Sequence, residues 1–187
     1  MSYDLHITAP ELSTDPSHRW TKRLNACDRM EYEFHPSVKF EVGRAGFWPI
    51  KVTTPRRRLF SSRKSYISGF EMFLSDFSFE SYFDCELEDD EGKKRKIAAE
   101  GFDFDLWQNF RLQVSISFKP YNAFEATLSF LSAAILTEEL NGLCHDPQTG
   151  QYFGKRDVFE WAKMQAERNN QGTSKNELVA YPFEGWQ

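Results

Sequence analysis

Hydrophobic and polar residues alternate along several short stretches of this chain, and this period of two is typical of strands buried on one face. The clearest stretch is 111–118, RLQVSISF, where every second residue is apolar. The residues expected to face the core are Leu112, Val114, Ile116 and Phe118. Similar patterns predict strands at 3–8, 30–42 and 47–52. Pro36 is expected to break or bulge the 30–42 strand, because proline cannot donate to a strand ladder.

The aromatic stretch 65–89 is predicted to form two antiparallel strands with a bend near 78–81. In the first strand, Phe73, Phe77 and Phe79 are separated by even numbers of residues and so share one face. In the later strand, Phe83, Cys85 and Leu87 share one face in the same way. The charged run 88–96 follows, with a glycine where the charge changes sign. This pattern predicts an exposed hairpin tip.

A helix is predicted over 122–140, where apolar residues recur at spacings of four, three and four. Those residues are Phe124, Leu128, Leu131 and Ile135. Asn122 is a suitable N-cap, and Glu125, three residues on, is its capping-box partner. Asn141 and Gly142 follow the last turn and predict a left-handed C-cap.

The stretch after this helix, LCHDPQTGQYF, predicts a short strand, a tight turn and a second extended segment. Residues 143–145 can return as the second strand of a β-α-β arrangement. Residues 146–150 include an aspartate, a proline and a glycine, which tight turns favour. We therefore expect Cys144 to be a buried strand residue and Asp146 to form the turn, after which 151–153 resume an extended conformation.

A second helix is predicted over 157–169, starting at Asp157 with Glu160 as its capping-box partner. Its apolar side is expected to consist of Val158, Trp161, Ala162 and the pair 164–165. The polar segment 10–29 contains two prolines and is expected to be a loop with at most a short helix over 17–27.

These elements predict an α+β fold: a twisted, mainly antiparallel sheet of about six to eight strands, with the two helices of the C-terminal half packed on it. Residues 1–172 are expected to form a single α+β domain. The tail, 173–187, ends in four apolar groups, which are Val179, Tyr181, Phe183 and Trp186. Either they dock on the domain or they form a short recognition segment, and solubility favours docking.

Composition and charge restrict the classes of protein. The chain has 187 residues, 16% of them aromatic, which is ample material for a core. The net charge of −5 argues against nucleic-acid binding, which needs a cationic surface, and is compatible with a basic protein partner. The first residues lack the regions of a secretory signal, no apolar run is long enough for a transmembrane helix, and the three cysteines are odd in number. We therefore expect a cytoplasmic protein with reduced thiols and no membrane partner.

No motif in the chain defines a catalytic chemistry, since P-loop, GxGxxG, GxSxG and HExxH patterns are all absent. Cys144 and His145 are adjacent, so on a strand they point to opposite faces and cannot form a nucleophile pair. His6 and His145 could lie on neighbouring strands, but no histidine pair has the spacing of metal ligands. We therefore predict no catalytic residues, no metal site and no cofactor. The alternative is an enzyme with a dispersed active site that uses Cys144 or His145.

Exposed acids and aromatics are the candidate contacts for a protein partner. Asp103 and Asp105 are expected on the outer face of a strand formed by GFDFDLW. The apolar residues of that strand, on its other face, are Phe102, Phe104 and Leu106. The complete set of predicted partner-binding residues is Glu88, Asp89, Asp90, Glu91, Asp103, Asp105, Trp107, Tyr181 and Trp186.

The opening SYDLHIT and the late segment ending in LNGLCHDPQTGQYF resemble small cytosolic bacterial proteins that begin with a similar YDLxI strand. Several of these resemble immunity proteins of bacterial toxin systems. The resemblance covers the first ten residues and about residues 111–165, which are structural segments without catalytic motifs. It implies a cytosolic α+β protein that binds a cognate toxin, such as a basic toxin domain, and occludes its active site. A homodimer built by sheet-edge pairing is a further alternative.

Overall fold

The computed structural model describes residues 2–12, 14–27, 29–55, 62–78, 104–120, 122–172 and 181–186. Within these residues, eight strands form one sheet, accompanied by four helices. The strands are β1 (Tyr3–Ala9), β2 (Glu31–Phe34), β3 (Ala45–Thr53), β4 (Ser65–Asp76), β5 (Leu112–Phe118), β6 (Leu143–Asp146), β7 (Gln151–Phe153) and β8 (Tyr181–Pro182). The helices are α1 (Ser17–Cys27), α4 (Phe104–Trp107), α5 (Ala123–Glu139) and α6 (Val158–Gly172).

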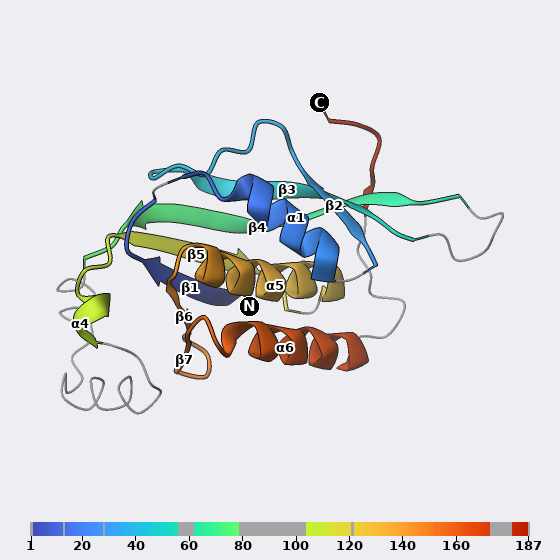
Figure 1. Ribbon diagram of the computed structural model, residues 1–187. Helices are drawn as coiled ribbons and strands as arrows, with labels where there is room; N and C mark the ends of the chain where they lie inside the picture. The colour runs from blue at the N-terminus through green and yellow to red at the C-terminus, as the bar shows by residue number, and fades with distance from the viewer. Residues whose placement is uncertain are drawn as a thin grey trace.

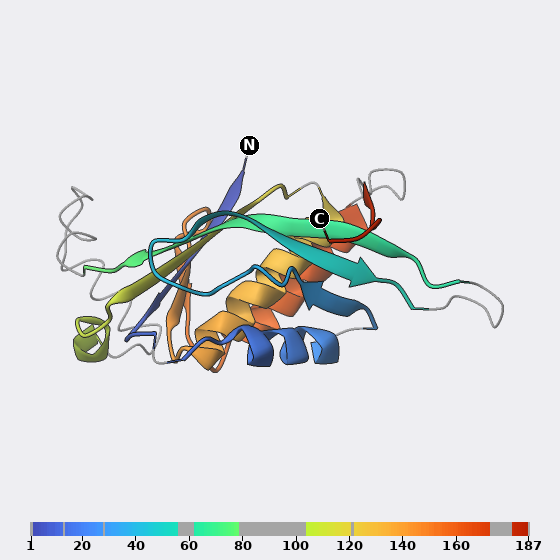
Figure 2. The same cartoon turned by 90° about the horizontal axis from the view of Figure 1, so that it is seen from above.

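Helices α1, α5 and α6 lie on the same face of the sheet, as Figures 1 and 2 show. Helix α5 packs directly on β1, β4, β5 and β6, while α1 and α6 pack on either side of it (Figure 1). The short α4 lies apart from them, at one end of the sheet (Figure 1). Among the helices in the described residues, none has the length and apolar character needed to cross a bilayer.

The strands follow the order β2-β3-β4-β5-β1-β6-β7, and β8 pairs with one end of β4. All the strand pairs among the described residues are antiparallel, which confirms the predicted α+β class with a mainly antiparallel sheet. Because β5 and β6 both pair with β1, they run parallel to each other on its two sides, and α5 connects them. This is the predicted β-α-β arrangement, with β1 inserted between its two strands.

The sheet face under the helices forms the core, and alternation along each strand decides which side chains it receives. On β5 all four predicted residues are buried: Leu112, Val114, Ile116 and Phe118. On β4 the buried hydrophobic side chains are Phe70, Met72 and Leu74. Phe73 therefore points to the opposite face of the sheet and is exposed.

Helix α1 lies where a short helix over 17–27 was predicted. It buries Trp20 and Leu24. The Trp20 ring contacts four aromatic rings from β2, β3, β4 and the β2–β3 connection, which are Phe34, Trp48, Phe70 and Phe40. We call these five rings the aromatic cluster. On the outer side of α1, arginines pair with the acids at the end of α5 and hold the two helices together; the pairs are Arg19–Glu139, Arg23–Glu138 and Arg23–Glu139.

Helix α5 has the predicted N-cap and C-terminal residues, but the capping box does not form, because the backbone N–H of Asn122 donates to the Lys119 carbonyl instead of to Glu125. The Asn122 side chain accepts a hydrogen bond from the backbone N–H of Glu125 at 3.3 Å. After the last turn, Asn141 adopts a left-handed conformation with φ of 50°. Gly142 then passes so close to β1 that a Cβ atom there would lie 2.4 Å from the carbonyl oxygen of Thr8. The lack of a side chain at 142 thus lets the chain pass directly from the helix into β6.

The turn at 146–150 also forms as predicted. One carboxylate oxygen of Asp146 accepts the backbone N–H of Gln148 at 3.1 Å. The backbone carbonyl of Asp146 accepts the N–H of Gly150 at 2.8 Å. The second carboxylate oxygen accepts the hydroxyl of Tyr3 at 2.7 Å. Both Cys144 and Asp146 are completely buried, so this turn is part of the packed body of the protein.

The predicted strand at 30–42 is wrong beyond Phe34. The chain turns at Pro36, and the N–H of Val38 donates to the carbonyl of His35 at 2.9 Å instead of to a neighbouring strand. Proline has no N–H for a ladder, so the apolar alternation that continues to Val42 does not form a strand.

The strand predicted in GFDFDLW is also wrong in its described part, because residues 104–107 form the helical turn α4. Two further turns follow directly, closed by Asn109 N–H to the Leu106 carbonyl and Phe110 N–H to the Trp107 carbonyl. Alternation over so few residues also fits a single helical turn. The Trp107 indole, which donates to the Thr8 hydroxyl at 2.9 Å, attaches this turn to β1.

In α6 the predicted residues Val158, Trp161 and Ala162 are buried, but Met164 is 42% exposed and Ala166 completes the buried side. The spacing of 158, 162 and 166 is the four-residue spacing of one helix face, which Met164 does not share. The second strand predicted within 65–89 and the hairpin tip at 88–96 lie outside the described residues.

Candidate functional site

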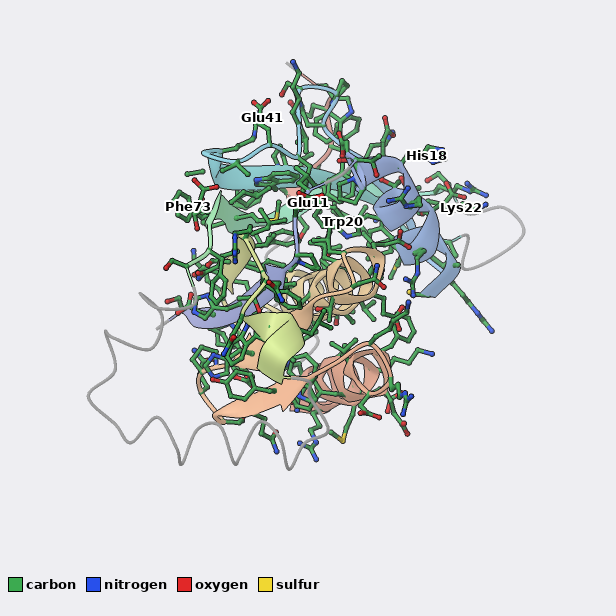
Figure 3. All side chains as sticks on the ribbon, turned by 60° about the vertical axis from the view of Figure 1, so that its left-hand side comes forward. Glu11, His18, Trp20, Lys22, Glu41 and Phe73 are labelled. Atoms are coloured by element: carbon green, nitrogen blue, oxygen red, sulfur yellow. The ribbon has the colours of Figure 1, made fainter. Side chains whose placement is uncertain are left out.

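The face of the sheet away from α5 carries three exposed aromatic side chains. Phe47, Phe73 and Tyr181 are 49%, 47% and 67% exposed. The first two lie on this face because their sequence neighbours Trp48 and Met72 are buried in the core. Figure 3 shows Phe73 on the opposite side of the sheet from α1. We call this surface the open face; in the described part of the chain, no helix other than the short α4 packs on it.

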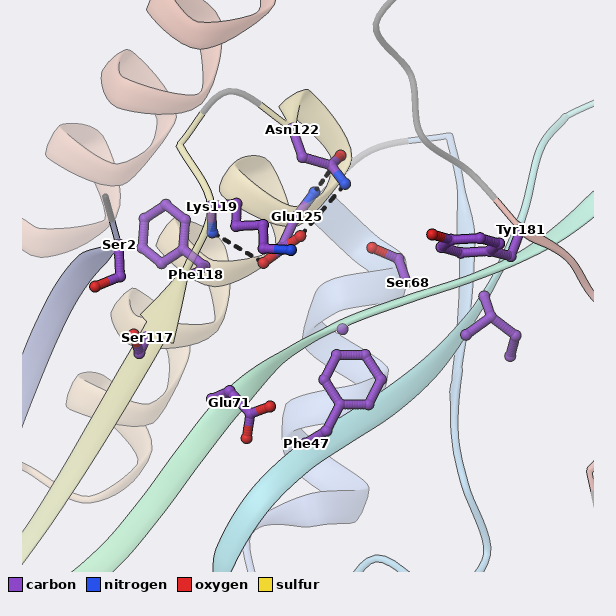
Figure 4. Close-up of a pocket in the computed structure, with 12 residues that line it drawn as sticks. Ser2, Phe47, Ser68, Glu71, Ser117, Phe118, Lys119, Asn122, Glu125 and Tyr181 are labelled. Atoms are coloured by element: carbon purple, nitrogen blue, oxygen red, sulfur yellow. Dashed lines mark hydrogen bonds between the residues drawn. The ribbon is translucent and has the colours of Figure 1, made fainter.

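A hollow of about 430 Å³ opens on this face, where β4 changes its neighbour from β5 to β8 (Figure 4). Its volume lies within the range of small-ligand sites, roughly 300–1,000 Å³. The lining residues that matter below are Phe47, Gly69, Glu71, Lys119, Glu125 and Tyr181. We refer to it as the hollow.

The strand ladder of β4 is interrupted inside the hollow. Pairing with β5 ends at Glu71 and pairing with β8 begins at Ile67, so Gly69 lies between the two ladders. In an antiparallel sheet the N–H and C=O of alternate residues point to the same side. The carbonyl of Ser65 accepts the N–H of Phe183, which lies on the β8 side of β4. The backbone N–H and C=O groups of the other odd-numbered residues of β4 therefore also point to this side. The N–H and C=O of Gly69 therefore face the hollow.

Gly69 also fixes one wall of the hollow. Its φ is 153°, a conformation that residues with side chains rarely adopt. A Cβ atom at this position would lie 2.2 Å from the carbonyl oxygen of Trp48 and 2.7 Å from the ring of Phe47. The Phe47 ring therefore occupies the space that a side chain at 69 would need, and the glycine sets its position.

Glu125 forms the opposite wall, from the first turn of α5. One of its carboxylate oxygens accepts the backbone N–H of Lys119 at 2.9 Å, and the other accepts the side-chain N–H of Asn122 at 3.3 Å (Figure 4). Burial raises the pKa of Glu125. The two hydrogen bonds and the positive charge of Lys119 oppose this rise, and the negative charge of Glu71 adds a smaller one. The hollow thus contains two carboxylates that repel each other.

A pair of histidines lies farther along the open face. His6 and His145 are opposite each other on β1 and β6, with ring centroids 6.4 Å apart. The ring of His145 stacks on Tyr152 at 4.2 Å, and Nδ1 of His6 is 2.9 Å from the hydroxyl of Ser115. Among the described residues, no group of three or more His, Cys, Asp or Glu side chains is arranged to hold a metal ion. The pair therefore contributes aromatic and polar surface to the open face.

The stability of the protein is expected to fall as the pH drops below 6.5, because burial lowers the pKa of His6 from that value, although Asp4 partly opposes the shift. The unfolded chain takes up a proton on His6 below pH 6.5, whereas the folded chain does so only at lower pH. In that interval the unfolded state binds more protons, so acidification favours unfolding.

The measurement is the melting temperature from about pH 7 to pH 5, the window in which histidine titrates. His6→Gln should flatten this dependence, whereas His18→Gln, an exposed position on α1, should leave it as in the wild type. Equal slopes for the wild type and His6→Gln would contradict the assignment.

The structure describes the side chains of only three of the predicted partner-binding residues, which are Trp107, Tyr181 and Trp186. Glu88, Asp89, Asp90, Glu91 and Asp103 lie outside the described residues, and of Asp105 only the backbone, in α4, is described. Trp107 is 2% exposed, so the prediction of an exposed aromatic contact there is wrong; its indole is committed to Thr8. Tyr181 lines the hollow. Trp186 packs edge-on against His35 at 4.7 Å and donates to Glu33 at 3.4 Å.

Cys144 does not have the surroundings of a nucleophile. It is completely buried, and burial raises the pKa of its thiol, so the neutral form predominates. The neighbouring His145 points to the open face, as alternation along the strand requires. The enzyme alternative based on a Cys144 nucleophile therefore has no support in this geometry.

Sequence reasoning missed the residues that the hollow brings together. Phe47, Gly69, Glu71 and Glu125 come from β3, β4 and α5. Glu125 was expected only as a capping residue, and its neighbours in space are distant in the sequence. No family model, curated protein or solved structure matches this chain.

Proposed function

We propose that this protein binds another protein through the open face of its sheet. The observation that carries the proposal is the combination of three exposed aromatic rings, Phe47, Phe73 and Tyr181, on one sheet face beside an acidic hollow. Aromatic side chains that protrude near polar groups are the common anchors of protein interfaces. An exposed apolar surface of this kind is costly unless a partner covers it.

Charge favours a basic partner. The whole chain has a net charge of −5. Glu71 of β4 and Asp4 of β1 belong to the open face, because they lie on either side of Ser117 of β5 and both pair with it. Among the described residues neither of them forms an ion pair. A basic surface brought against this face would therefore find unneutralised carboxylates, which accelerate association and define its orientation.

In its specific form, the proposal is an immunity protein that occludes the active site of a basic toxin domain in the cytoplasm. Support comes from the resemblance of the opening strand and the 111–165 segment to such proteins, together with the acidic open face. The sheet provides a rigid platform, and an inhibitor of this kind needs affinity and shape, without catalytic groups of its own.

The test is affinity capture of the tagged protein from its own cells, with mass spectrometry of what binds. A stoichiometric basic protein that is toxic when expressed alone, and harmless when this protein is co-expressed, would support the proposal. Capture of no stoichiometric partner, together with no protection against any neighbouring gene product, would contradict it.

Truncation of Phe73 is expected to weaken binding of that partner by about 30-fold, the effect of removing an aromatic anchor worth about 2 kcal/mol. Because Phe73 is 47% exposed and outside the core, Phe73→Ala should leave the melting temperature nearly unchanged. The measurement is the Kd by calorimetry. Met164→Ala, at an exposed apolar position of α6 on the other side of the sheet, is the matched control and should bind as the wild type does.

A further inference from the structure

We propose that the hollow is the receptor for an arginine side chain of the protein partner. The inference rests on the proposed protein-binding function and adds the chemistry of one contact. Its elements are the carboxylates of Glu71 and Glu125, the rings of Phe47 and Tyr181, and the backbone polar groups of Gly69, all of which line the same hollow.

The lining of the hollow contains two carboxylates and one lysine, so its negative charges outnumber its positive charge. Glu71 and Glu125 are near enough for the charge of one to raise the pKa of the other. The positive charge of Lys119, the cation of the lining, lowers the pKa of Glu125, but its side chain forms no ion pair with either carboxylate within the described residues. A second positive group between the carboxylates would remove their repulsion, and the half-buried position of Glu125 would strengthen the attraction.

The shape of the hollow favours a planar cation with several donors. A guanidinium group donates from five N–H groups in one plane and can contact two carboxylates at once. Its flat faces stack on aromatic rings, and Phe47 and Tyr181 both line the hollow. The carbonyl of Gly69 provides a further acceptor at the interruption of the ladder. A lysine ammonium group has three donors and no flat face, so it would use fewer of these groups.

The hollow is already formed in the free protein. The Phe47 ring is held over Gly69, and Glu125 is held by hydrogen bonds from Lys119 and Asn122 (Figure 4). These hydrogen bonds fix the orientation of the Glu125 carboxylate before a ligand binds, so the lone pairs that remain free already have a defined direction. A site arranged in advance loses little entropy when it binds, so even a single amino-acid derivative should bind measurably.

The experiment is a titration of the full-length protein with N-acetyl-arginine methylamide, observed by ¹H–¹⁵N NMR. The matched probe is N-acetyl-citrulline methylamide, which keeps the shape of arginine but has no charge. The arginine probe should bind with a Kd in the millimolar range and shift the backbone amide signals of Gly69 and Lys119 first. The citrulline probe and N-acetyl-lysine methylamide should bind at least several-fold more weakly.

Variants test whether the carboxylates carry the binding. Glu71→Gln and Glu125→Gln should each weaken binding of the arginine probe by about tenfold, as expected for loss of one charge-assisted pair. Glu160→Gln, an exposed acid on α6, makes the same change of charge away from the hollow and should have no effect. Glu71 is exposed on the strand surface, so its variant remains folded and keeps the test valid if Glu125→Gln unfolds the protein.

Two results would overturn the inference: equal shifts with the citrulline probe, or wild-type affinity for the arginine probe in Glu71→Gln. The proposed function is tested separately by the capture of a partner. A captured partner without an arginine response would leave protein binding in place and remove this contact. An arginine response confined to Gly69 and its neighbours would support the hollow even if no protein partner were captured.

Discussion

Replacing Trp20 with alanine is expected to lower the free energy of unfolding by about 3–5 kcal/mol, the range found for buried aromatic residues. Trp20 has no exposed surface and lies at the centre of the aromatic cluster. Its ring centroid is 4.4 Å from that of Phe34 and 5.8 Å from that of Trp48. Alanine would leave a cavity that these rings cannot fill, because they are fixed on β2 and β3.

The measurement is chemical denaturation followed by tryptophan fluorescence and, independently, by far-ultraviolet circular dichroism. Trp20→Phe is the control that retains most of the ring volume. It should cost about 1–2 kcal/mol, since it mainly removes the indole hydrogen bond to Ser132, whose length is 3.2 Å. A loss below about 1 kcal/mol for Trp20→Ala would show that α1 does not contribute its ring to the core.

Gly69→Ala should destabilise the protein by about 3 kcal/mol or more, from two separate causes. The backbone conformation, with φ of 153°, is strained for any residue with a Cβ atom. The new methyl group would also meet the Trp48 carbonyl at 2.2 Å, and this backbone atom belongs to the paired strand β3. Relief of the contact requires β3 and β4 to separate, which disturbs the centre of the sheet.

Gly46→Ala distinguishes the two causes. Gly46 also has a positive φ, of 129°, but a Cβ atom there would meet nothing within 4 Å. Gly46→Ala should therefore lower the free energy of unfolding only through the backbone strain, by about 1–2 kcal/mol. Melting temperatures and denaturation midpoints of both variants give the comparison. Equal losses for Gly46→Ala and Gly69→Ala would contradict the close approach at Gly69 and, with it, the position of the Phe47 ring.

Trp20→Ala and Gly69→Ala probe opposite sides of the same two strands, β3 and β4. Trp20 contacts Trp48 and Phe70 on the helix side of β3 and β4, whereas Gly69 supports Phe47 on the open face. The open face is thus formed by the reverse side of the strands that the aromatic cluster holds in place. A binding surface built in this way is rigid because its support is the core itself.

The sequence by itself determined the elements whose signals are local. The alternation in 111–118 defines β5, because neighbouring side chains on a strand point to opposite faces. The 122–140 helix, its N-cap at Asn122 and its left-handed residue at Asn141 follow from spacing and from terminal residues within one segment. The turn at Asp146 is equally local. From these elements the α+β class follows, since a β-α-β unit and several alternating strands have few ways to bury their apolar sides.

Only the tertiary structure decided which strands are neighbours, and therefore which residues meet. The insertion of β1 between β5 and β6 depends on pairing across more than a hundred residues, for which alternation has no signal. The parity of β4 was equally open, because its sequence has aromatic residues on both faces and only packing against α1 and α5 selects Phe70 over Phe73. The hollow joins Phe47, Glu71, Glu125 and Tyr181 where two ladders on β4 stop short of each other. Such a site is a property of distances in space, and no single segment of the chain contains it.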